Sequence, residues 1–102
     1  MELINSNNFN DTINSNSVTI VDVYADWCGP CKMISPLLEQ LSSELTNVKF
    51  VKLDADADGE LVRSFGIQSI PTILFFKNGE LKQKLIGFQP KDRLKSLAES
   101  LL

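Results

Sequence analysis

Histidine is absent from this chain of 102 residues, and its absence excludes several kinds of chemistry at once. Without an imidazole group, the chain can form neither a Ser-His nor a Cys-His catalytic pair, nor a zinc site that requires histidine. Clusters of positive charge are also missing: the sequence contains no run of basic residues, and its 10 Lys and Arg residues are outnumbered by 13 Asp and Glu residues. Because nucleic-acid binders carry clustered Lys and Arg, no nucleic-acid partner is expected. Chemistry is left to thiols, carboxylates, lysine and the backbone.

Long hydrophobic runs are lacking as well. The longest strongly apolar stretch, residues 70–76, is far too short to cross a bilayer, and residues 1–5 lack the features of a secretory signal. We therefore expect a cytoplasmic protein with no membrane partner. With 43% hydrophobic and 23% charged residues, the composition is that of an ordinary globular protein. The length predicts a single domain over residues 1–102, which we expect to be a monomer.

Segments typical of strands and helices alternate along the chain. Residues 18–24 are rich in β-branched residues and almost continuously apolar, as in a strand buried on both faces. Between residues 31 and 45, apolar side chains recur at helical spacing, and Pro36 is expected to kink this helix without ending it. The other expected elements are strands at 3–4, 48–53, 72–77 and 81–86, helices at 6–14, 59–65 and 90–101, and a hairpin turn at Asn78-Gly79. This order predicts an α/β fold, with a central mixed sheet of four to five strands, a C-terminal antiparallel hairpin and about four flanking helices.

The only two cysteines, Cys28 and Cys31, stand where the strand at 18–24 gives way to the long helix. Side chains three residues apart on a helical turn share one face, so the two sulfurs can bond. Free N–H groups and the dipole at the helix N-terminus favour an anion, which predicts a reactive Cys28 thiolate with a depressed pKa. Cys31, one turn further in and better shielded, suits the resolving role. Gly29 leaves room for a partner's backbone, and Pro30 suits a helix start.

A structural disulfide and half of a zinc site are the alternatives for this pair. A disulfide that closes a loop of about four residues stabilises a fold by only about 2 kcal/mol, and zinc would need two further ligands from carboxylates. Redox chemistry is therefore favoured. Residues 54–59 match the first half of a calcium-binding loop, but Phe65 stands where that loop needs a bidentate Glu. A solvated loop before a helix is favoured there.

The segment 21–32, VDVYADWCGPCK, resembles the signature of the thioredoxin family. Pro36, the segments 51–54, 70–72 and 75–79, and Gly87 match the family in the same order, so the resemblance covers essentially the whole chain. It implies a thioredoxin fold and a protein dithiol-disulfide oxidoreductase that reduces target proteins through a mixed disulfide and contributes to redox homeostasis. It further implies recycling by an NADPH-dependent thioredoxin reductase, with no cofactor bound by this chain. Tyr24 is a mild departure, since many members have Trp or Phe there, and we expect it to alter packing but not chemistry.

The resemblance also assigns roles to residues outside the cysteine pair. A lone Asp in a strand is more often exposed, but the match places Asp22 beneath the cysteines, where it assists proton transfer from Cys31. Its pKa is then expected to be raised, mainly by desolvation. Lys52 is expected near Asp22, where it tunes that carboxylate.

A docking surface for extended polypeptide is the last implication. Trp27 precedes the reactive cysteine, and a large amphipathic ring there suits a partner-binding surface better than the core. The resemblance implies a cis peptide bond before Pro71, a backbone at Ile70 that pairs with the target, and space beside Gly87. Two other function classes stay open: a non-catalytic binding module, and an oxidase or isomerase that runs the same thiol chemistry in another direction.

Overall fold

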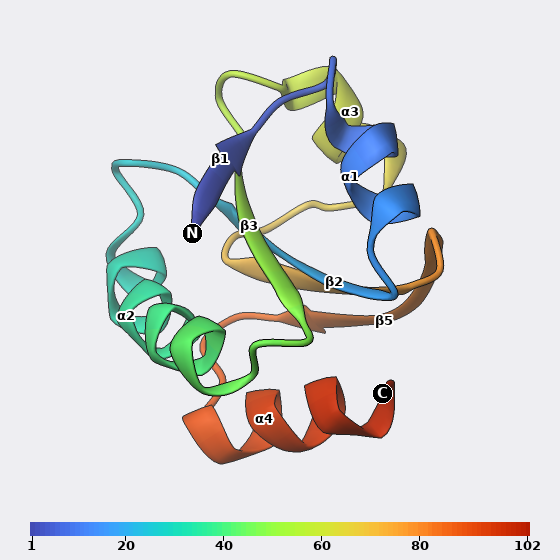
Figure 1. Ribbon diagram of the computed structural model, residues 1–102. Helices are drawn as coiled ribbons and strands as arrows, with labels where there is room; N and C mark the ends of the chain where they lie inside the picture. The colour runs from blue at the N-terminus through green and yellow to red at the C-terminus, as the bar shows by residue number, and fades with distance from the viewer.

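A computed structural model describes residues 1–102, and five strands form one mixed sheet at its centre (Figure 1). The strands are β1 (Glu2–Ile4), β2 (Val18–Tyr24), β3 (Lys49–Asp54), β4 (Thr72–Lys77) and β5 (Glu80–Ile86). Their order is β1-β3-β2-β4-β5; β3 is parallel to β1 and β2, while β4 runs antiparallel to β2 and β5 antiparallel to β4. The predicted mixed sheet with a C-terminal hairpin is confirmed.

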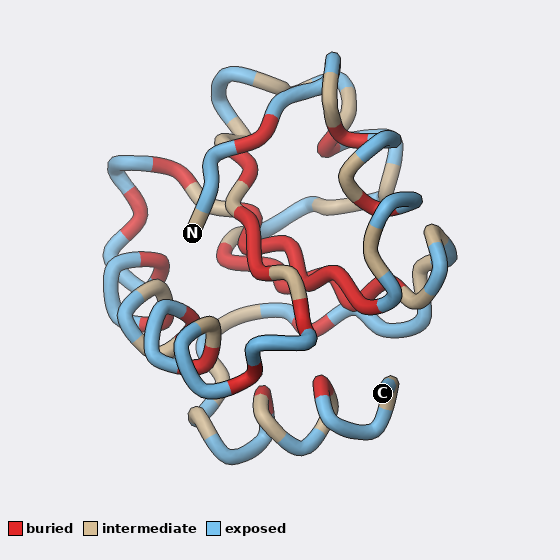
Figure 2. Tube along the Cα trace, in the orientation of Figure 1, coloured by how far each residue is buried: buried red, intermediate tan, exposed pale blue.

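Helices cover both faces of this sheet. They are α1 (Phe9–Ser15), α2 (Gly29–Glu44), α3 (Gly59–Ser64) and α4 (Lys91–Ser100). Side chains of α2 and α4 share one buried cluster with the strands, and side chains of α1 and α3 share a second cluster on the opposite face. Figure 2 shows the buried segments concentrated in the central strands, with the helices buried along one side only. The longest helix, α2, has 16 residues, and no helix combines the length and apolar character that crossing a bilayer requires.

Alternation along β2 decides which side chains face which helices. Successive residues of a strand point to opposite faces of the sheet. Val21 and Val23 belong to the cluster under α1 and α3, whereas Ile20 belongs to the cluster under α2 and α4. Asp22 and Tyr24 therefore continue the row of Ile20 on the α2 side. The strand thus carries a carboxylate to the face that α2 covers.

Two helix starts differ from the sequence prediction. The helix α1 begins at Phe9, three residues late, because a turn held by side chains precedes it: the N–H of Asn5 donates to Oδ1 of Asn8 at 2.8 Å. Pro90, expected inside the first turn of the closing helix, is instead its N-cap, with an extended ψ of 153°. Both differences come from residues whose local conformation is extended or turned just before the helix.

The predicted proline within a helix and the predicted hairpin turn are both found in the structure. Pro36 lies inside α2, and the helix continues beyond it to Glu44. Asn78 and Gly79 connect β4 to β5 with φ values of 52° and 83°. A two-residue type I′ turn requires positive φ at both positions, which is why Asn-Gly suits it.

Candidate active site

The two cysteines lie where β2 leads into α2. Cys28 is the N-cap residue of α2, with φ −88° and ψ 111°, and its Sγ accepts a hydrogen bond from the backbone N–H of Cys31 at 3.2 Å. A disulfide joins the two residues, whose Cα atoms are 5.3 Å apart. In the reduced protein the same helix terminus, with its free N–H groups and positive dipole end, favours a thiolate on Cys28.

The two cysteines have nearly the same solvent exposure. Cys28 is 4% exposed and Cys31 is 2% exposed, a smaller difference than the shielding expected from the sequence. What differs is their position, since only Cys28 caps the helix. Cys31 lies inside the first turn and lines a cavity between α2 and the sheet.

Asp22 is a buried carboxylate, with 1% of its surface exposed. Its Oδ2 accepts a hydrogen bond from the Ser35 hydroxyl at 2.9 Å, while its Oδ1 has no hydrogen-bond partner. Burial raises the pKa of Asp22 from 3.8 to about 6; the Ser35 hydrogen bond and the charge of Lys52 oppose the rise. The predicted raised pKa, with desolvation as its main cause, is confirmed. A carboxyl group with this pKa can exchange a proton near neutral pH.

Lys52 lies beside Asp22 in the sheet. The two residues are directly paired in the parallel register of β2 and β3. Lys52 Nζ sits 5.2 Å from the centre of the Tyr24 ring, within the range of a cation–π contact. Burial raises the pKa of the Tyr24 hydroxyl, and the carboxylates of Asp54, Asp26 and Asp22 add to the rise.

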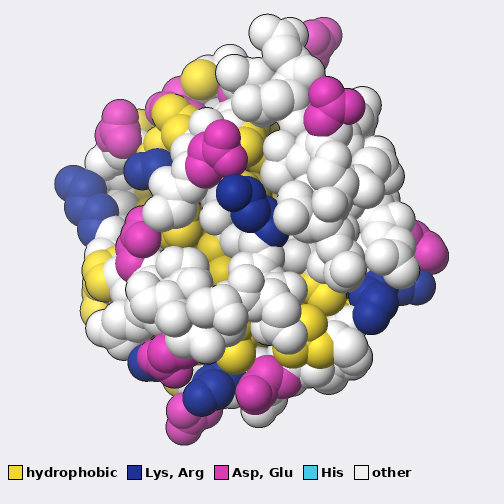
Figure 3. All heavy atoms as spheres, in the orientation of Figure 1, with side chains coloured by type: hydrophobic (Ala, Val, Ile, Leu, Met, Phe, Trp, Pro, Cys, Tyr) yellow, Lys and Arg dark blue, Asp and Glu magenta, His cyan; other side chains and the backbone are white.

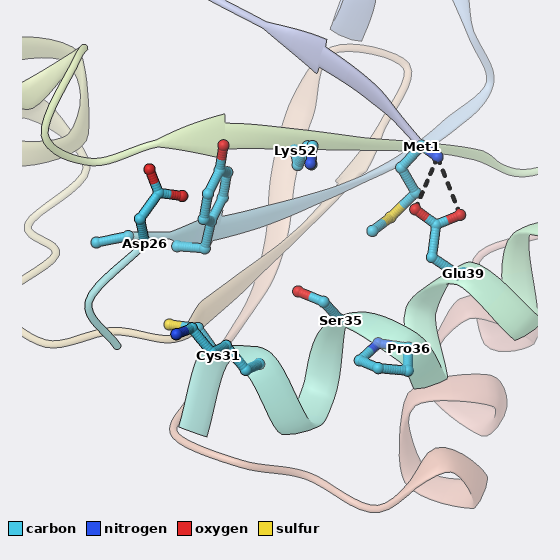
Figure 4. Close-up of a pocket in the computed structure, with 10 residues that line it drawn as sticks. Met1, Asp26, Cys31, Ser35, Pro36, Glu39 and Lys52 are labelled. Carbon is cyan, nitrogen blue, oxygen red and sulfur yellow. Dashed lines mark hydrogen bonds and ion pairs between the residues drawn. The ribbon is translucent and has the colours of Figure 1, made fainter. Parts of the chain in front are cut away.

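A cavity of about 530 Å³ opens between α2 and the adjoining ends of β2 and β3 (Figure 4). Cys31 and Ser35 reach it from α2, and Lys52 reaches it from β3. At one end the Met1 ammonium forms an ion pair with Glu39 at 2.9 Å. Over the face drawn in Figure 3, cationic and anionic side chains are interspersed, with neither sign forming a continuous patch.

The residues expected on the docking surface come from three segments, one of which contacts the cysteine cluster through Ile70. Trp27 is 70% exposed, and its Nε1 donates a hydrogen bond to Asp56 Oδ2 at 2.9 Å. Ile70 packs against the buried cluster that contains both cysteines, and the peptide bond between Ile70 and Pro71 is cis. The N–H of Gly87 donates to the carbonyl of Pro71 at 2.8 Å, which ties the end of β5 to the same loop.

Both glycines that the sequence predicts at the docking surface, Gly29 and Gly87, stand in open space. A Cβ atom at Gly29 or Gly87 would meet no neighbouring atom within 4 Å. At Gly87 a second requirement applies, because its φ of +83° is a backbone conformation that other residues rarely adopt. Pro30 occupies the first turn of α2, where its missing N–H would have no helical partner.

Comparison with known proteins gives a consistent result. A family model described as thioredoxin matches residues 1–100. Thioredoxins from Chlamydia muridarum and Staphylococcus saprophyticus are each 43% identical to this chain, over 97 and 100 residues. These matches cover 95% and 97% of this chain, and 94% and 95% of the two relatives. The chain belongs to the thioredoxin family.

Solved thioredoxin structures share the fold. A mutant thioredoxin from Halobacterium salinarum superposes with a TM-score of 0.92 at 36% identity, covering 98% of this chain and 88% of that one. Plasmodium falciparum thioredoxin superposes with a TM-score of 0.91 at 36% identity, covering 98% of both chains. The predicted thioredoxin fold is confirmed.

Family membership together with the cysteine pair identifies the activity. Members of the thioredoxin family are protein disulfide oxidoreductases, and this chain carries the bonded pair Cys28 and Cys31 that such chemistry uses. Recycling by thioredoxin reductase is typical of the family. The protein is therefore a protein disulfide oxidoreductase, as the sequence predicts.

The acidic loop before α3 uses its carboxylates within the protein. Asp54 Oδ1 accepts hydrogen bonds from the N–H groups of Asp56 and Ala57 at 2.9 and 3.3 Å, and Asp58 Oδ1 accepts one from the N–H of Ser6 at 3.0 Å. No group of three or more His, Cys, Asp or Glu side chains is arranged to hold a metal ion. The loop shapes the start of α3 and meets Trp27 through Asp56.

The sequence did not point to several residues that lie next to the predicted ones. Ser35, which contacts Asp22, and Asp56, which contacts Trp27, act through partners 13 and 29 positions away, so no local pattern marks them. Ile86 and Phe88 are large exposed apolar residues on either side of Gly87. The available signal for these two was their apolar character next to a glycine already assigned to the surface.

Proposed function

We propose that the protein reduces disulfides in target proteins through Cys28 as the attacking thiol and Cys31 as the resolving thiol. The observation that carries this assignment is the cap of α2, where Cys28 Sγ accepts the N–H of Cys31 at 3.2 Å. An N–H aimed at a sulfur stabilises negative charge on it and so favours the thiolate that attacks disulfides. Cys31 is not the N-cap residue, so its sulfur is not given the same stabilisation.

In the first step the Cys28 thiolate attacks one sulfur of the target disulfide. A bond forms between Cys28 Sγ and that sulfur while the target's own S–S bond breaks, and the leaving thiolate takes a proton from solvent. The product is a mixed disulfide between the protein and its target.

In the second step Asp22 takes the proton of the Cys31 thiol, and the Cys31 thiolate attacks Cys28 Sγ. The Cys28–Cys31 bond forms as the bond between Cys28 Sγ and the target sulfur breaks, and the target leaves with that sulfur as a thiolate. Two electrons have passed from the cysteine pair to the target. The buried carboxyl, whose pKa of about 6 lies close to neutrality, suits this proton transfer, and Lys52 tunes it electrostatically.

Targets are proposed to dock as extended polypeptide across the face beside the cysteines. The backbone of Ile70 would pair with the target, and the open space at Gly29 and Gly87 admits its chain. Trp27 supplies a large exposed ring at the edge of that face. The proposed docking residues are Trp27, Gly29, Pro30, Ile70, Pro71 and Gly87.

The proposed setting is the cytoplasm, with the 102 residues acting as one monomeric domain. A pair that reduces targets must itself be reduced again, and an NADPH-dependent thioredoxin reductase supplies those electrons. Reducing compartments maintain such a cycle, whereas oxidising ones would hold the pair as a disulfide.

The decisive experiment is reduction of insulin disulfides, driven by dithiothreitol or by NADPH and thioredoxin reductase. The unmodified protein is expected to accelerate reduction, and Cys28→Ser is expected to lose the acceleration. Cys31→Ser is the matched variant: it keeps the attacking thiol, so the reduced variant mixed with insulin in the absence of dithiothreitol should accumulate a mixed disulfide. Full turnover by Cys28→Ser, or trapping through residue 31 in place of residue 28, would contradict the assignment.

A further inference from the structure

Ser35 is set apart from the other serines of α2 by the direction of its hydroxyl. A serine within a helix commonly bonds a carbonyl of the preceding turn. Ser42 and Ser43 follow this habit, and both donate to the carbonyl of Glu39. Ser35 instead donates across to Asp22 of β2 at 2.9 Å.

The contact divides the Asp22 carboxylate into two unlike oxygens. Oδ2 is occupied by the Ser35 hydroxyl, whereas Oδ1 is buried without any hydrogen-bond partner. An unpartnered carboxylate oxygen in a buried site is costly, unless another group comes to it at some stage of the protein's work. Oδ1 is thus the oxygen left to receive a proton.

Ser35, which contacts Asp22, also lies on the same helix as Cys31. It lies four residues after Cys31, one turn along α2, so the two side chains project from the same helix face. Both line the cavity shown in Figure 4. The hydroxyl therefore belongs to the wall in which the resolving thiol sits.

Other charged groups surround this carboxylate from each neighbouring element. Lys52 on β3 favours its ionised form, and Glu39 on α2 opposes it. Glu39 is itself paired with the Met1 ammonium, while Tyr24, Asp26 and Lys32 also line the cavity. Among these groups, only Ser35 holds an oxygen of Asp22 through a hydrogen bond.

We propose that Ser35 is a positioning residue for disulfide exchange: its hydroxyl holds Oδ2 of Asp22 and leaves Oδ1 as the oxygen that takes the proton of Cys31. This inference rests on the proposed function, because it presumes that Asp22 receives that proton. No electron moves in this step; the proton passes from Cys31 Sγ to Oδ1, and the hydroxyl of Ser35 keeps its own proton.

The test is a set of substitutions for which the Asp22 pKa and the pH dependence of the resolution rate are measured. Ser35→Ala removes the donor to the carboxylate, and alanine preserves the helix. A hydrogen bond to a charged group of ordinary strength corresponds to a pKa change of about one unit, so the Asp22 pKa should rise by about that amount. The Asp22 carboxyl carbon is followed by NMR titration of the disulfide form. Resolution of a mixed disulfide between Cys28 and a model peptide is followed after a jump from pH 4 to higher pH.

Resolution by Ser35→Ala should be about fivefold slower at pH 6 and unchanged at pH 8.5, where Asp22 is ionised in both proteins. Ser35→Thr restores a hydroxyl and should restore the original profile. Ser42→Ala is the control, since it makes the same chemical change on the same helix away from Asp22.

An Asp22 titration that is unchanged in Ser35→Ala, or an equal loss of rate at every pH, overturns the positioning role. These outcomes are separable from failure of the proposed function. If Cys28→Ser is inactive while Ser35→Ala behaves as the unmodified protein does, only the role of Ser35 is lost.

Discussion

The two faces of β2 carry different kinds of side chains and have different roles. Val21 and Val23 point into an entirely apolar cluster that also holds three mutually packed aromatic rings, Phe9, Phe65 and Phe76. On the other face the row of side chains that begins with Val18 and Ile20 continues into Asp22 and Tyr24.

The comparison separates the two roles of the strand: one face contributes mainly to stability, and the other carries the proton-transfer group. An apolar face gains free energy from every residue that it buries, at any pH. The α2 face gives up part of that gain at Asp22, because a buried carboxylate with an unpartnered oxygen disfavours the folded state once it ionises. The same burial holds the proton-transfer group close to the cysteines. Substitutions on the two faces should therefore differ in sign and in pH dependence.

Phe76→Ala is expected to give the largest stability change. Phe76 is 2% exposed and its ring lies 5.7 Å from Phe9 and 5.9 Å from Phe65, so truncation removes buried contacts and leaves a cavity. We expect a loss of about 3–5 kcal/mol in the free energy of unfolding, measured by urea denaturation at 25 °C. The loss should be the same at pH 4.5 and pH 8.

Phe88→Ala provides the control for that substitution. Phe88 is 47% exposed, and its truncation should change the free energy of unfolding by no more than about 0.5 kcal/mol. A small effect at Phe76, or a loss that depends strongly on pH, would show that the apolar face is not the pH-independent part of the fold.

Asp22→Ala is expected to change stability in the opposite direction. The folded-state pKa of about 6 lies above the ordinary value of 3.8, so the penalty is absent below pH 3.8, grows as the pH rises and is complete above pH 6. A shift of this size corresponds to about 3 kcal/mol, from which lost packing and an orphaned Ser35 hydroxyl subtract about 1 kcal/mol. The variant should be more stable by about 2 kcal/mol at pH 8, and disulfide exchange should slow.

Urea denaturation of the disulfide form at pH 4 and pH 8 checks this prediction. Asp22→Asn is the matched variant, because it removes the charge, keeps the shape and still offers an oxygen to Ser35. A stability gain that is equal at the two pH values would mean that the cost of Asp22 is not its ionisation.

The same contrast explains what could be predicted from sequence. The strands at Val18–Tyr24 and Thr72–Lys77 were predicted with their observed bounds because β-branched, continuously apolar segments have few other ways to be buried. The start of α1 could not be predicted from periodicity, because side-chain hydrogen bonds between Asn5 and Asn8 compete with the helix.

For the site, local pattern and family resemblance led to the cysteines, Asp22 and Lys52, but not to the hydroxyl group that donates to the carboxylate. Ser35 is one of several serines in the chain, and its importance comes from a hydrogen bond to a strand 13 residues earlier. The orientation of Lys52 over Tyr24 likewise depends on the register between β2 and β3. Contacts of this kind exist only after the sheet has formed.

Tyr24 gives the smallest expected effect and the finest test of the chemical face. Its ring lies under Lys52, whose charge lowers the Asp22 pKa, so the ring holds in place a cation that acts on the site. Tyr24→Leu removes the aromatic face; the free energy of unfolding should fall by about 0.5–1 kcal/mol and the Asp22 pKa should rise, by less than in Ser35→Ala. Tyr24→Phe keeps the ring and should leave both quantities unchanged. If the two variants titrate alike, or if leucine lowers the Asp22 pKa, then Lys52 acts on Asp22 without help from the ring, and Tyr24 matters for packing alone.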